Sequence, residues 1–307
     1  MKLSAILKPE YFYQPQVALR RILPFKRYSS PEFVQQQLPW GLFIRVRPLE
    51  EHGRMLSTLG VIDLAVTEAL FRLAEPGEIA VDVGANIGYM TAVLAVRLNS
   101  IPGGQVCSFE AHPEIFEELK YNVEQWRQKL SHINFDIQQI AISDKPGEVA
   151  LEIPESFAFN RGLASVVNLE RASKKLNSAP LKTVTVKSTS LDELFPAPQK
   201  IGVLKLDVEG YELIVLKGAI QLLQEQRIRD CVFEEHRDYP TDVTQFFEDK
   251  GYCVFRIQRQ FLGPRLLEAN SQVARINWQP TSFLATQQPE RAMKCFKERG
   301  WKALRWQ

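Results

Sequence analysis

Apolar and polar residues follow two alternating patterns through the middle of the chain, and together they predict an α/β fold. A short apolar run at Ile79–Val83 is rich in β-branched residues, as expected of a strand buried on both faces of a parallel sheet. Helical spacing follows, because Met90, Leu94 and Leu98 fall near one face of a helix. The turn Gly84–Gly88 is therefore expected at the carboxyl edge of the sheet, where open α/β sheets bind ligands.

Further strands are predicted downstream. Two apolar runs, Gln105–Phe109 and Val203–Leu206, are each followed by an acidic residue, and Cys231–His236 alternates between two faces. Gly251–Ile257 and Ser282–Thr286 are predicted to form the final antiparallel pair. We expect an α/β, Rossmann-like mixed sheet of seven strands, mostly parallel, with an antiparallel strand near the C-terminus and helices on both faces.

The turn after the first strand has the sequence G-A-N-I-G, which departs from the dinucleotide-binding fingerprint G-x-G-x-x-G. A pyrophosphate needs bare backbone amides at a helix N-terminus. Asp82 before the turn and Asn86 within it instead suit a ligand that carries both an ammonium and a carboxylate, as S-adenosylmethionine does. The plainer interpretation is an ordinary strand-to-helix turn.

Glu110 follows the next predicted strand, 28 positions after Asp82. A carboxylate there can accept hydrogen bonds from both hydroxyls of a ribose, although the equivalent acid of dinucleotide folds lies about 20 positions on. The turn at residues 101–104 accounts for the extra length. An acid at a strand end can equally cap the following helix.

A third strand end concentrates acidic residues. Asp207, Glu209 and Glu212 put three carboxyl groups within six positions, which is costly unless water, a cation or a ligand compensates them. Glu212 is expected on the first turn of a helix, where the helix dipole favours acids, and Glu209 could cap that helix. We expect Asp207 to have a functional role.

Five segments, in this order, resemble the FkbM-type methyltransferases: V-D-V-G-A-N-I-G-Y-M-T, S-F-E-A-H-P, A-I-S-D, L-D-E-L and K-L-D-V-E-G-Y-E-L-I-V-L-K-G-A. The resemblance covers about Val61–Gly251, and K-L-D-V-E-G is its most specific part. It implies the class I methyltransferase fold, S-adenosylmethionine as the cofactor, and O-methylation of a hydroxyl on a sugar or another natural-product small molecule. At Ala111–Pro113 the chain departs from the family, which more often has Glu-Pro there.

The resemblance also implies a place for each part of the cofactor. Four residues of the first turn region would hold the methionine portion, and Glu110 would hold the ribose. The residues implied for the methionine portion are Asp82, Gly84, Asn86 and Gly88, and those implied for the adenine rim are Ala141, Ile142, Ser143 and Asp144.

An alcohol acceptor needs a general base, because its free hydroxyl is a poor nucleophile. His236 and Asp207 are the candidates for that base. His236 forms, with Glu234, the E-x-H ending that the family has, and Asp207 is expected at the ligand edge of the sheet. A divalent cation at Asp207 would be another way to lower the pKa of the hydroxyl. No second compelling ligand set is visible, so no metal ligand is assigned and metal dependence stays open.

Two other functions remain open. A nucleotide-dependent oxidoreductase would need the third glycine of its fingerprint and a hydride-handling residue, and neither is present. A non-catalytic domain that binds S-adenosylmethionine is harder to exclude, because an intact cofactor turn does not prove turnover. Binding of the cofactor without methylation of any acceptor would favour it.

Composition narrows the choice of partners and compartment. A net charge of +2, from 38 basic and 36 acidic residues, gives no electrostatic case for nucleic acid. The four cysteines show neither C-x-x-C spacing nor a small secreted framework, so reduced thiols are expected. The apolar part of residues 1–10 is too short for a signal peptide, and no run approaches the roughly 18 apolar residues of a membrane span. We expect a cytoplasmic protein.

The pattern divides the chain into three parts. Residues 1–60 are predicted to form an aromatic and basic N-terminal extension without a catalytic motif; it could touch a membrane, although such stretches more often pack on their own domain. The resemblance implies that residues 61–290 form the methyltransferase domain, with an insertion at about 148–187 that we expect to close over the active site. Glu68, on a helix predicted at 61–73, is expected to face the cofactor. Residues 291–307 are predicted to form an amphipathic helical tail.

Overall fold

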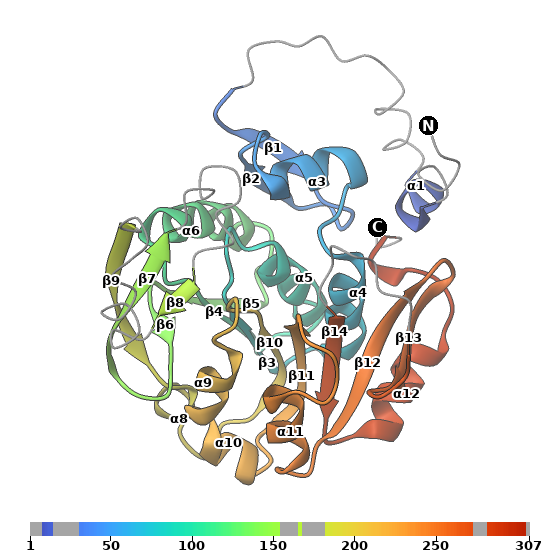
Figure 1. The fold of residues 1–307 in the computed structure, drawn as a ribbon. Helices are drawn as coiled ribbons and strands as arrows, with labels where there is room; N and C mark the ends of the chain where they lie inside the picture. Colours follow the sequence, from blue (N-terminus) through green and yellow to red (C-terminus); the bar gives the residue numbers. More distant parts are fainter. Residues whose placement is uncertain (1–7, 15–30, 154–164, 168–181, 273–280, 305–307) are drawn as a thin grey trace.

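A central sheet of eight strands organises the protein, and five of them are parallel (Figure 1). The computed structural model describes residues 8–14, 31–153, 165–167, 182–272 and 281–304. In spatial order the strands are β13 (Gly263–Glu268), β12 (Cys253–Gln260), β14 (Thr281–Thr286), β11 (Ile228–Glu235), β10 (Ile201–Leu206), β3 (Ile79–Val83), β4 (Gly104–Phe109) and β5 (Ile133–Gln138). The strands from β11 to β5 run parallel, whereas β14 is antiparallel to both of its neighbours. The predicted class I methyltransferase fold and its final antiparallel pair are confirmed.

The predicted number of strands was too small by one. The chain turns back after β12 at Phe261 and Leu262, and β13 pairs antiparallel with β12 as an extra edge strand. The sequence of β13 begins Gly263-Pro264, which is typical of a turn rather than a strand. Proline is tolerated in this position because β13 has a neighbour on one side only.

Helices cover both faces of the sheet, because alternate residues of each strand belong to different cores. Ala80 packs in the core under one helical layer, and the adjacent Val81 packs in the core on the opposite face. The first layer contains α4 (Leu64–Leu73), α5 (Tyr89–Leu98), α6 (Pro113–Arg127) and α12 (Pro289–Lys297). The second contains α8 (Leu191–Leu194), α9 (Glu212–Lys217), α10 (Ile220–Gln224) and α11 (Asp242–Glu248).

A second, four-stranded sheet lies beside the central one (Figure 1). Its order is β6 (Ala141–Ile142), β9 (Lys182–Thr189), β7 (Gly147–Ile153) and β8 (Ser165–Val167). The two flanks of the predicted insertion, β7 and β9, pair antiparallel. Residues 154–164 and 168–181, in the middle of that insertion, lie outside the described residues.

Residues of the N-terminal extension form a cap over one end of the central sheet (Figure 1). The cap contains β1 (Val34–Gln37), β2 (Phe43–Val46) and α3 (Glu51–Leu59), while α1 (Pro9–Tyr13) lies apart from it. Asn122 of α6 accepts a hydrogen bond from the backbone N of Arg45 at 2.8 Å, and Trp126 donates to the carbonyl of Phe43 at 2.7 Å. Side chains of α6 therefore hold the hairpin of β1 and β2 through hydrogen bonds to the backbone of β2.

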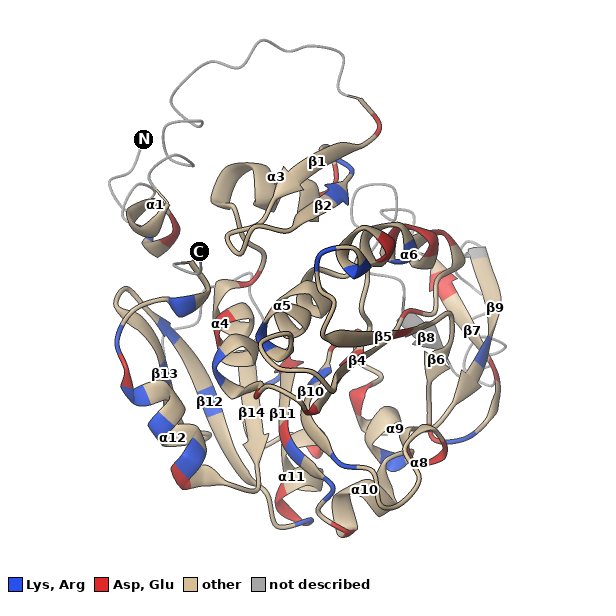
Figure 2. Ribbon diagram, turned by 180° about the vertical axis from the view of Figure 1, so that it is seen from behind, with Lys and Arg blue, Asp and Glu red and all other residues tan. Residues whose placement is uncertain are grey.

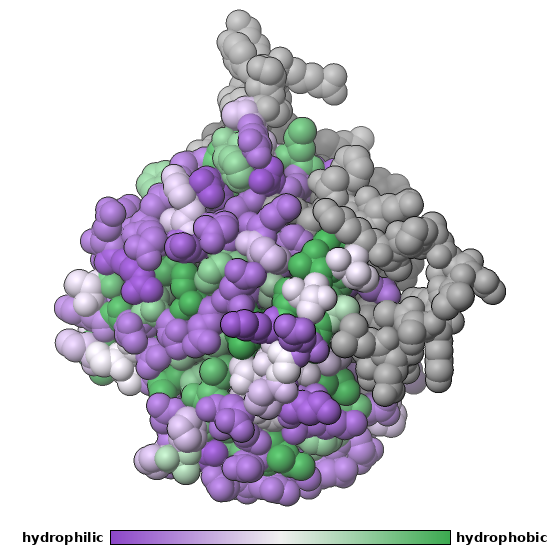
Figure 3. Space-filling view, turned by 90° about the vertical axis from the view of Figure 1, so that its left-hand side faces the viewer, coloured by the Kyte–Doolittle hydropathy of each residue, from purple (hydrophilic) through white to green (hydrophobic). Residues whose placement is uncertain are grey.

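The surface mixes charge and polarity. Figure 2 shows acidic and basic residues interspersed along the described part of the chain. Figure 3 shows a mainly hydrophilic face with scattered apolar areas. Within the described ranges, no helix has both the length and the apolar composition needed to cross a membrane.

The C-terminal part packs through a buried ion pair on α4. Arg72 contacts Glu68 at 2.6 Å, and both side chains are almost completely buried. Glu68 also accepts hydrogen bonds from the backbone N of Lys302 and of Ala303, at 2.8 Å each, in the 3-10 helix η4 (Lys302–Leu304). Glu68 thus faces the C-terminal segment, and the expectation that it faces the cofactor was wrong.

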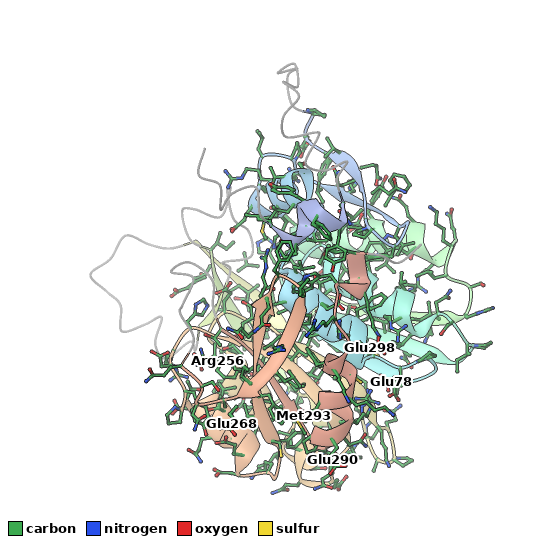
Figure 4. The ribbon with its side chains drawn as sticks, turned by 90° about the vertical axis from the view of Figure 1, so that its right-hand side faces the viewer. Glu78, Arg256, Glu268, Glu290, Met293 and Glu298 are labelled. Carbon is green, nitrogen blue, oxygen red and sulfur yellow. The ribbon has the colours of Figure 1, made fainter. Side chains whose placement is uncertain are left out.

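The amphipathic nature of the tail is visible on α12. Phe296 and the following Trp301 are buried, whereas Met293 is half exposed. Figure 4 shows Glu290, Met293 and Glu298 at the surface of this part of the molecule. The helix begins at Pro289 and ends at Lys297, so it starts earlier and is shorter than the predicted tail.

Removal of Glu68 should destabilise the fold. Glu68→Ala leaves the Arg72 guanidinium buried without its carboxylate, and we expect the free energy of unfolding to fall by about 3 to 5 kcal/mol. Urea denaturation followed by circular dichroism measures it. Glu290→Ala, an exposed position on α12, is the control and should change stability by less than about 0.5 kcal/mol. A loss below about 1 kcal/mol for Glu68→Ala would show that the pair does not hold the C-terminal segment.

Candidate active site

A cavity of about 270 Å³ lies at the carboxyl ends of four adjacent parallel strands. Part of its wall comes from the ends of β3, β4, β10 and β11 and from the residues that follow these strands. This is the edge at which the sequence placed the turn Gly84–Gly88, Glu110 and Asp207. Parallel strands bring their carboxyl ends together, so residues far apart in sequence share one wall.

The turn after β3 needs its glycines for close packing. Gly84 has a φ of +75°, and a Cβ atom there would collide with the backbone carbonyl of Asp207. Gly88 has a φ of +94°, and its Cβ would approach Leu119 of α6 to 2.7 Å. Gly84 and Asn86 line the cavity, whereas Gly88 lies behind the turn at the start of α5. Both glycines thus let the backbone of this turn pack against its neighbours.

Glu110 is held in place by backbone amides. Its two carboxylate oxygens accept hydrogen bonds from the N of Asn86 at 2.9 Å and from the N of His112 at 2.8 Å. Burial raises the pKa of Glu110, and these two donors act against that rise. Each oxygen keeps a further lone pair, so the carboxylate can still accept from a diol in the cavity that it lines. The helix cap itself is at His112, because α6 begins at Pro113.

Asp82 lies below the cavity wall and contacts Lys205. It is completely buried, accepts a hydrogen bond from Thr91 Oγ1 at 2.7 Å, and lies 3.3 Å from the ammonium of Lys205. Lys205 also donates to the carbonyl of Gly84 at 2.8 Å and lies 3.5 Å from Asp207. Burial alone would lower the pKa of Lys205, but the two carboxylates outweigh it and raise that pKa above its ordinary value.

Lys205 lines the cavity and the sequence interpretation missed it. A signal was present, because a lysine inside the apolar run V-L-K-L must be buried and must therefore have a carboxylate partner. Asp82 is that partner. Asp82 does not itself line the cavity, so its contribution to the site is to hold Lys205.

The predicted adenine rim is divided by the structure. Ala141 and Ile142 line an apolar part of the cavity. Ser143 is buried away from it, with its hydroxyl 3.1 Å from that of Tyr211, and Asp144 is exposed. The apolar part of the wall suits a planar heterocycle, and Glu110, which follows β4, suits a ribose diol. The residues present therefore fit the nucleoside part of S-adenosylmethionine.

Carboxyl groups gather in another part of the wall, which contains Asp63, Asp207, Glu209 and Glu234. Asp63 is the N-cap of α4, and its side chain accepts hydrogen bonds from the N of Ala65 and of Val66 at 3.1 Å each. Burial, together with the neighbouring Asp63 and Asp207, raises the pKa of Glu234 well above its ordinary value.

Glu209 lies in a strained backbone conformation, with a φ of +49°. Burial, Asp207 and Glu212 together raise the pKa of Glu209 to about 7. Its side chain is one-third exposed, so the group borders both the cavity and solvent.

His236 lies outside the cavity wall. Strand β11 ends at Glu235, so His236 belongs to the following turn and its side chain is 67% exposed. Its Nε2 lies 3.9 Å from Glu209 Oε2. Of the two candidate bases, Asp207 borders the cavity and His236 stands at its rim beside Glu209. Their catalytic roles stay predictions.

The cap supplies wall residues that sequence reasoning missed. Helix α3 contributes Glu51, His52 and Met55, and the segment that leads into α4 contributes Ile62 and Asp63. No motif marks these positions, because their proximity to the strand ends comes from the packing of the cap on α6. Among the residues that the structure describes, no group of three or more His, Cys, Asp or Glu side chains is arranged to hold a metal ion.

Comparison with known proteins agrees with this arrangement. The family model described as the methyltransferase FkbM domain matches residues 82–254, which is more than half of the chain. The chain is 28% identical over 207 residues to the hexuronic acid methyltransferase AglP of Haloferax volcanii, an alignment that covers 66% of this chain and 74% of that protein. It is 37% identical over 87 residues to a protein-L-isoaspartate O-methyltransferase of Aeropyrum pernix, covering 27% of this chain and 31% of that protein.

Among solved structures, the methyltransferase FkbM of Methylobacillus flagellatus is similar with 14% sequence identity and a TM-score of 0.42. The match covers 69% of this chain but only 44% of that one, so the chain spans less than half of that protein. The family model provides the assignment: the chain belongs to the FkbM methyltransferase domain family, and it is a methyltransferase whose cofactor is S-adenosylmethionine.

Proposed function

We propose that the chain is an O-methyltransferase that methylates a hydroxyl on a saccharide or another natural-product small molecule. The observation that carries the proposal is the cavity wall, in which the held carboxylate of Glu110 and a group of acids that can take up a proton lie at the same edge of the sheet. The Haloferax relative, named as a hexuronic acid methyltransferase, supports a saccharide acceptor.

The proposed cofactor site uses the turn after β3 and the end of β4. Glu110 accepts from the ribose hydroxyls, and the turn Gly84–Gly88 with Asn86 holds the methionine portion. Asp82 acts through Lys205, which it positions against the carbonyl of Gly84. The adenine packs on Ala141 and Ile142, with Ser143 and Asp144 behind and beside that wall. When bound, the cofactor supplies an activated methyl group on a sulfonium.

The proposed base receives the proton of the acceptor hydroxyl. The sequence points to Asp207 and His236, and the geometry adds Glu209 to this pair. Asp207 lines the cavity but already contacts Lys205, whereas Glu209 lines it with a pKa of about 7, near the value that suits a general base. We propose that Glu209 takes the proton, that Asp207 orients the acceptor, and that His236, 3.9 Å from Glu209, passes the proton to solvent.

The reaction is tested by mass spectrometry of a small-molecule extract incubated with the protein and methyl-labelled S-adenosylmethionine. We expect the label in a small molecule as an ether that survives alkali. A labelled amine, or an ester that alkali removes, would contradict O-methylation of a hydroxyl. Binding of the cofactor without labelling of any compound would favour a non-catalytic binding domain.

Cofactor binding should depend on Glu110. Calorimetry is expected to show binding of S-adenosylmethionine and its demethylated product, and no binding of NAD. Glu110→Ala should weaken cofactor binding by roughly 1.5 to 3 kcal/mol, because the diol loses charged hydrogen bonds. Glu117→Ala, an exposed position on α6, is the matched control and should bind normally. An unchanged dissociation constant in folded Glu110→Ala would remove this residue from the ribose site.

The proposed base predicts a pH dependence. Glu209 must lose its proton before it can accept another, so kcat/KM for the cofactor should rise with pH through about 7 and then level off. Glu209→Gln should lower kcat by about a hundredfold or more and abolish this limb of the profile, with nearly unaltered cofactor affinity.

The variant His236→Ala distinguishes the proposed role of His236 from that of Glu209. If His236 only passes the proton onward, kcat should fall less than in Glu209→Gln, and the rise near pH 7 should remain. Full turnover in Glu209→Gln together with a hundredfold loss in His236→Ala would assign the base to His236. Full turnover in both variants would leave Asp207 as the base.

A further inference from the structure

The cavity wall is strongly unbalanced in charge. Among the described residues that line it, six carry carboxyl groups and one is a lysine; no arginine lines it. The carboxyl groups belong to Glu51, Asp63, Glu110, Asp207, Glu209 and Glu234. Lys205, the lysine, is already engaged by Asp82, Asp207 and the carbonyl of Gly84. The two histidines of the wall, His52 and His112, add no permanent positive charge.

Asp63 and Glu234 form a carboxyl pair across this wall. Asp63 precedes α4 and Glu234 lies near the end of β11, and both line the cavity. Burial, together with the charge and hydrogen-bonding capacity of Asp63, raises the pKa of Glu234. Asp63 is fixed by the two backbone amides that it caps. One proton between two carboxyl groups leaves one O–H donor and several acceptor oxygens, which together match sugar hydroxyls.

A carboxylate on the ligand would be repelled by this wall, whereas sugar hydroxyls would be bound. It would lie against like charges in a partly buried site, with neither an arginine nor an unengaged lysine in the described wall to bind it. A neutral hydroxyl, or an ammonium, has no such penalty. The charge of the wall therefore discriminates between saccharides that have the same ring and differ in one substituent.

We propose that Asp63 and Glu234 select the acceptor, that this acceptor is a saccharide without a carboxylate, neutral or amine-bearing, and that a uronic acid is excluded. The proposal rests on the proposed function and narrows it. It also separates this chain from the Haloferax relative, whose name specifies a hexuronic acid.

Three methyl glycosides of one ring test the selectivity: the neutral glucoside, the glucosaminide with its ammonium, and the glucuronide with its carboxylate. Binding is measured by saturation-transfer NMR on the full chain loaded with S-adenosylhomocysteine, so turnover is not needed. We expect the first two to bind and the glucuronide to bind at least about tenfold more weakly. Equal or tighter binding of the glucuronide overturns the proposal, and so does the absence of binding by all three.

Methyl transfer to the same glycosides is then measured with labelled S-adenosylmethionine. Binding with the expected selectivity but without transfer would count against the proposed function and leave the selectivity standing. Transfer to the glucuronide at a kcat/KM equal to that of the glucoside would overturn the selectivity and leave the function standing.

The double variant Asp63→Asn, Glu234→Gln identifies the residues responsible. Both replacements keep hydrogen-bonding groups, and asparagine still caps α4, but the charge of the pair is removed. The glucuronide should then bind within about threefold of the glucoside. Glu193→Gln, an exposed position on α8, removes the same charge outside the cavity and should retain the full selectivity.

Circular dichroism and cofactor affinity show whether the double variant is folded. If it is not, Asp63→Asn alone serves, because asparagine preserves the helix cap. Selectivity that is unchanged in a folded variant would overturn the role of the pair.

Discussion

The buried ammonium of Lys205 connects the parts of the candidate site. Its contacts with Asp82, Asp207 and the carbonyl of Gly84 join the inside of β3, the turn after β3 and the end of β10. A buried charge is costly unless several oxygens surround it, so these segments cannot move apart without leaving it uncompensated. Gly84 permits the arrangement, because a Cβ atom at that position would collide with the carbonyl of Asp207.

Asn122 extends this connection to the cap. Its side-chain amide donates to the carbonyl of Ile87 at 2.9 Å, in the turn after β3, while its carbonyl oxygen accepts from the N of Arg45 in β2. One side chain of α6 therefore holds both the proposed cofactor turn and the N-terminal hairpin. Helix α3 follows that hairpin, which explains how residues far from any recognisable motif come to line the cavity.

The sequence predicted those features that depend on local pattern. Ile79–Val83 reads as a strand because it is short, apolar and β-branched, and the polar residues after such strands must meet at one edge. Strand β13 was missed because its Gly263-Pro264 start suits a turn as well as an edge strand. Asp63 gave no signal, since an acid before a helix is first of all an N-cap.

The position of His236 shows a different limit. Alternation along β11 places Glu234 and His236 on one face only while the strand continues, and the strand ends at Glu235. The side chain beyond that end turns outward and is two-thirds exposed. Sequence spacing therefore identified the correct strand end but not the direction of its last side chain, which depends on where hydrogen bonding to β14 stops.

A wall with this many acids is tolerated because its carboxyl groups differ in environment. Glu110 accepts hydrogen bonds from two backbone amides, and Asp207 lies beside the ammonium of Lys205. For Glu209 and Glu234 the charge of Lys205 is outweighed by burial and by like-charged neighbours, so the pKa of each is raised. Glu234 therefore favours its protonated form more strongly than a glutamate in water does, while Glu209, with a pKa of about 7 and partial exposure, exchanges its proton near neutrality. Different surroundings thus give the same chemical group different proton affinities in one cavity.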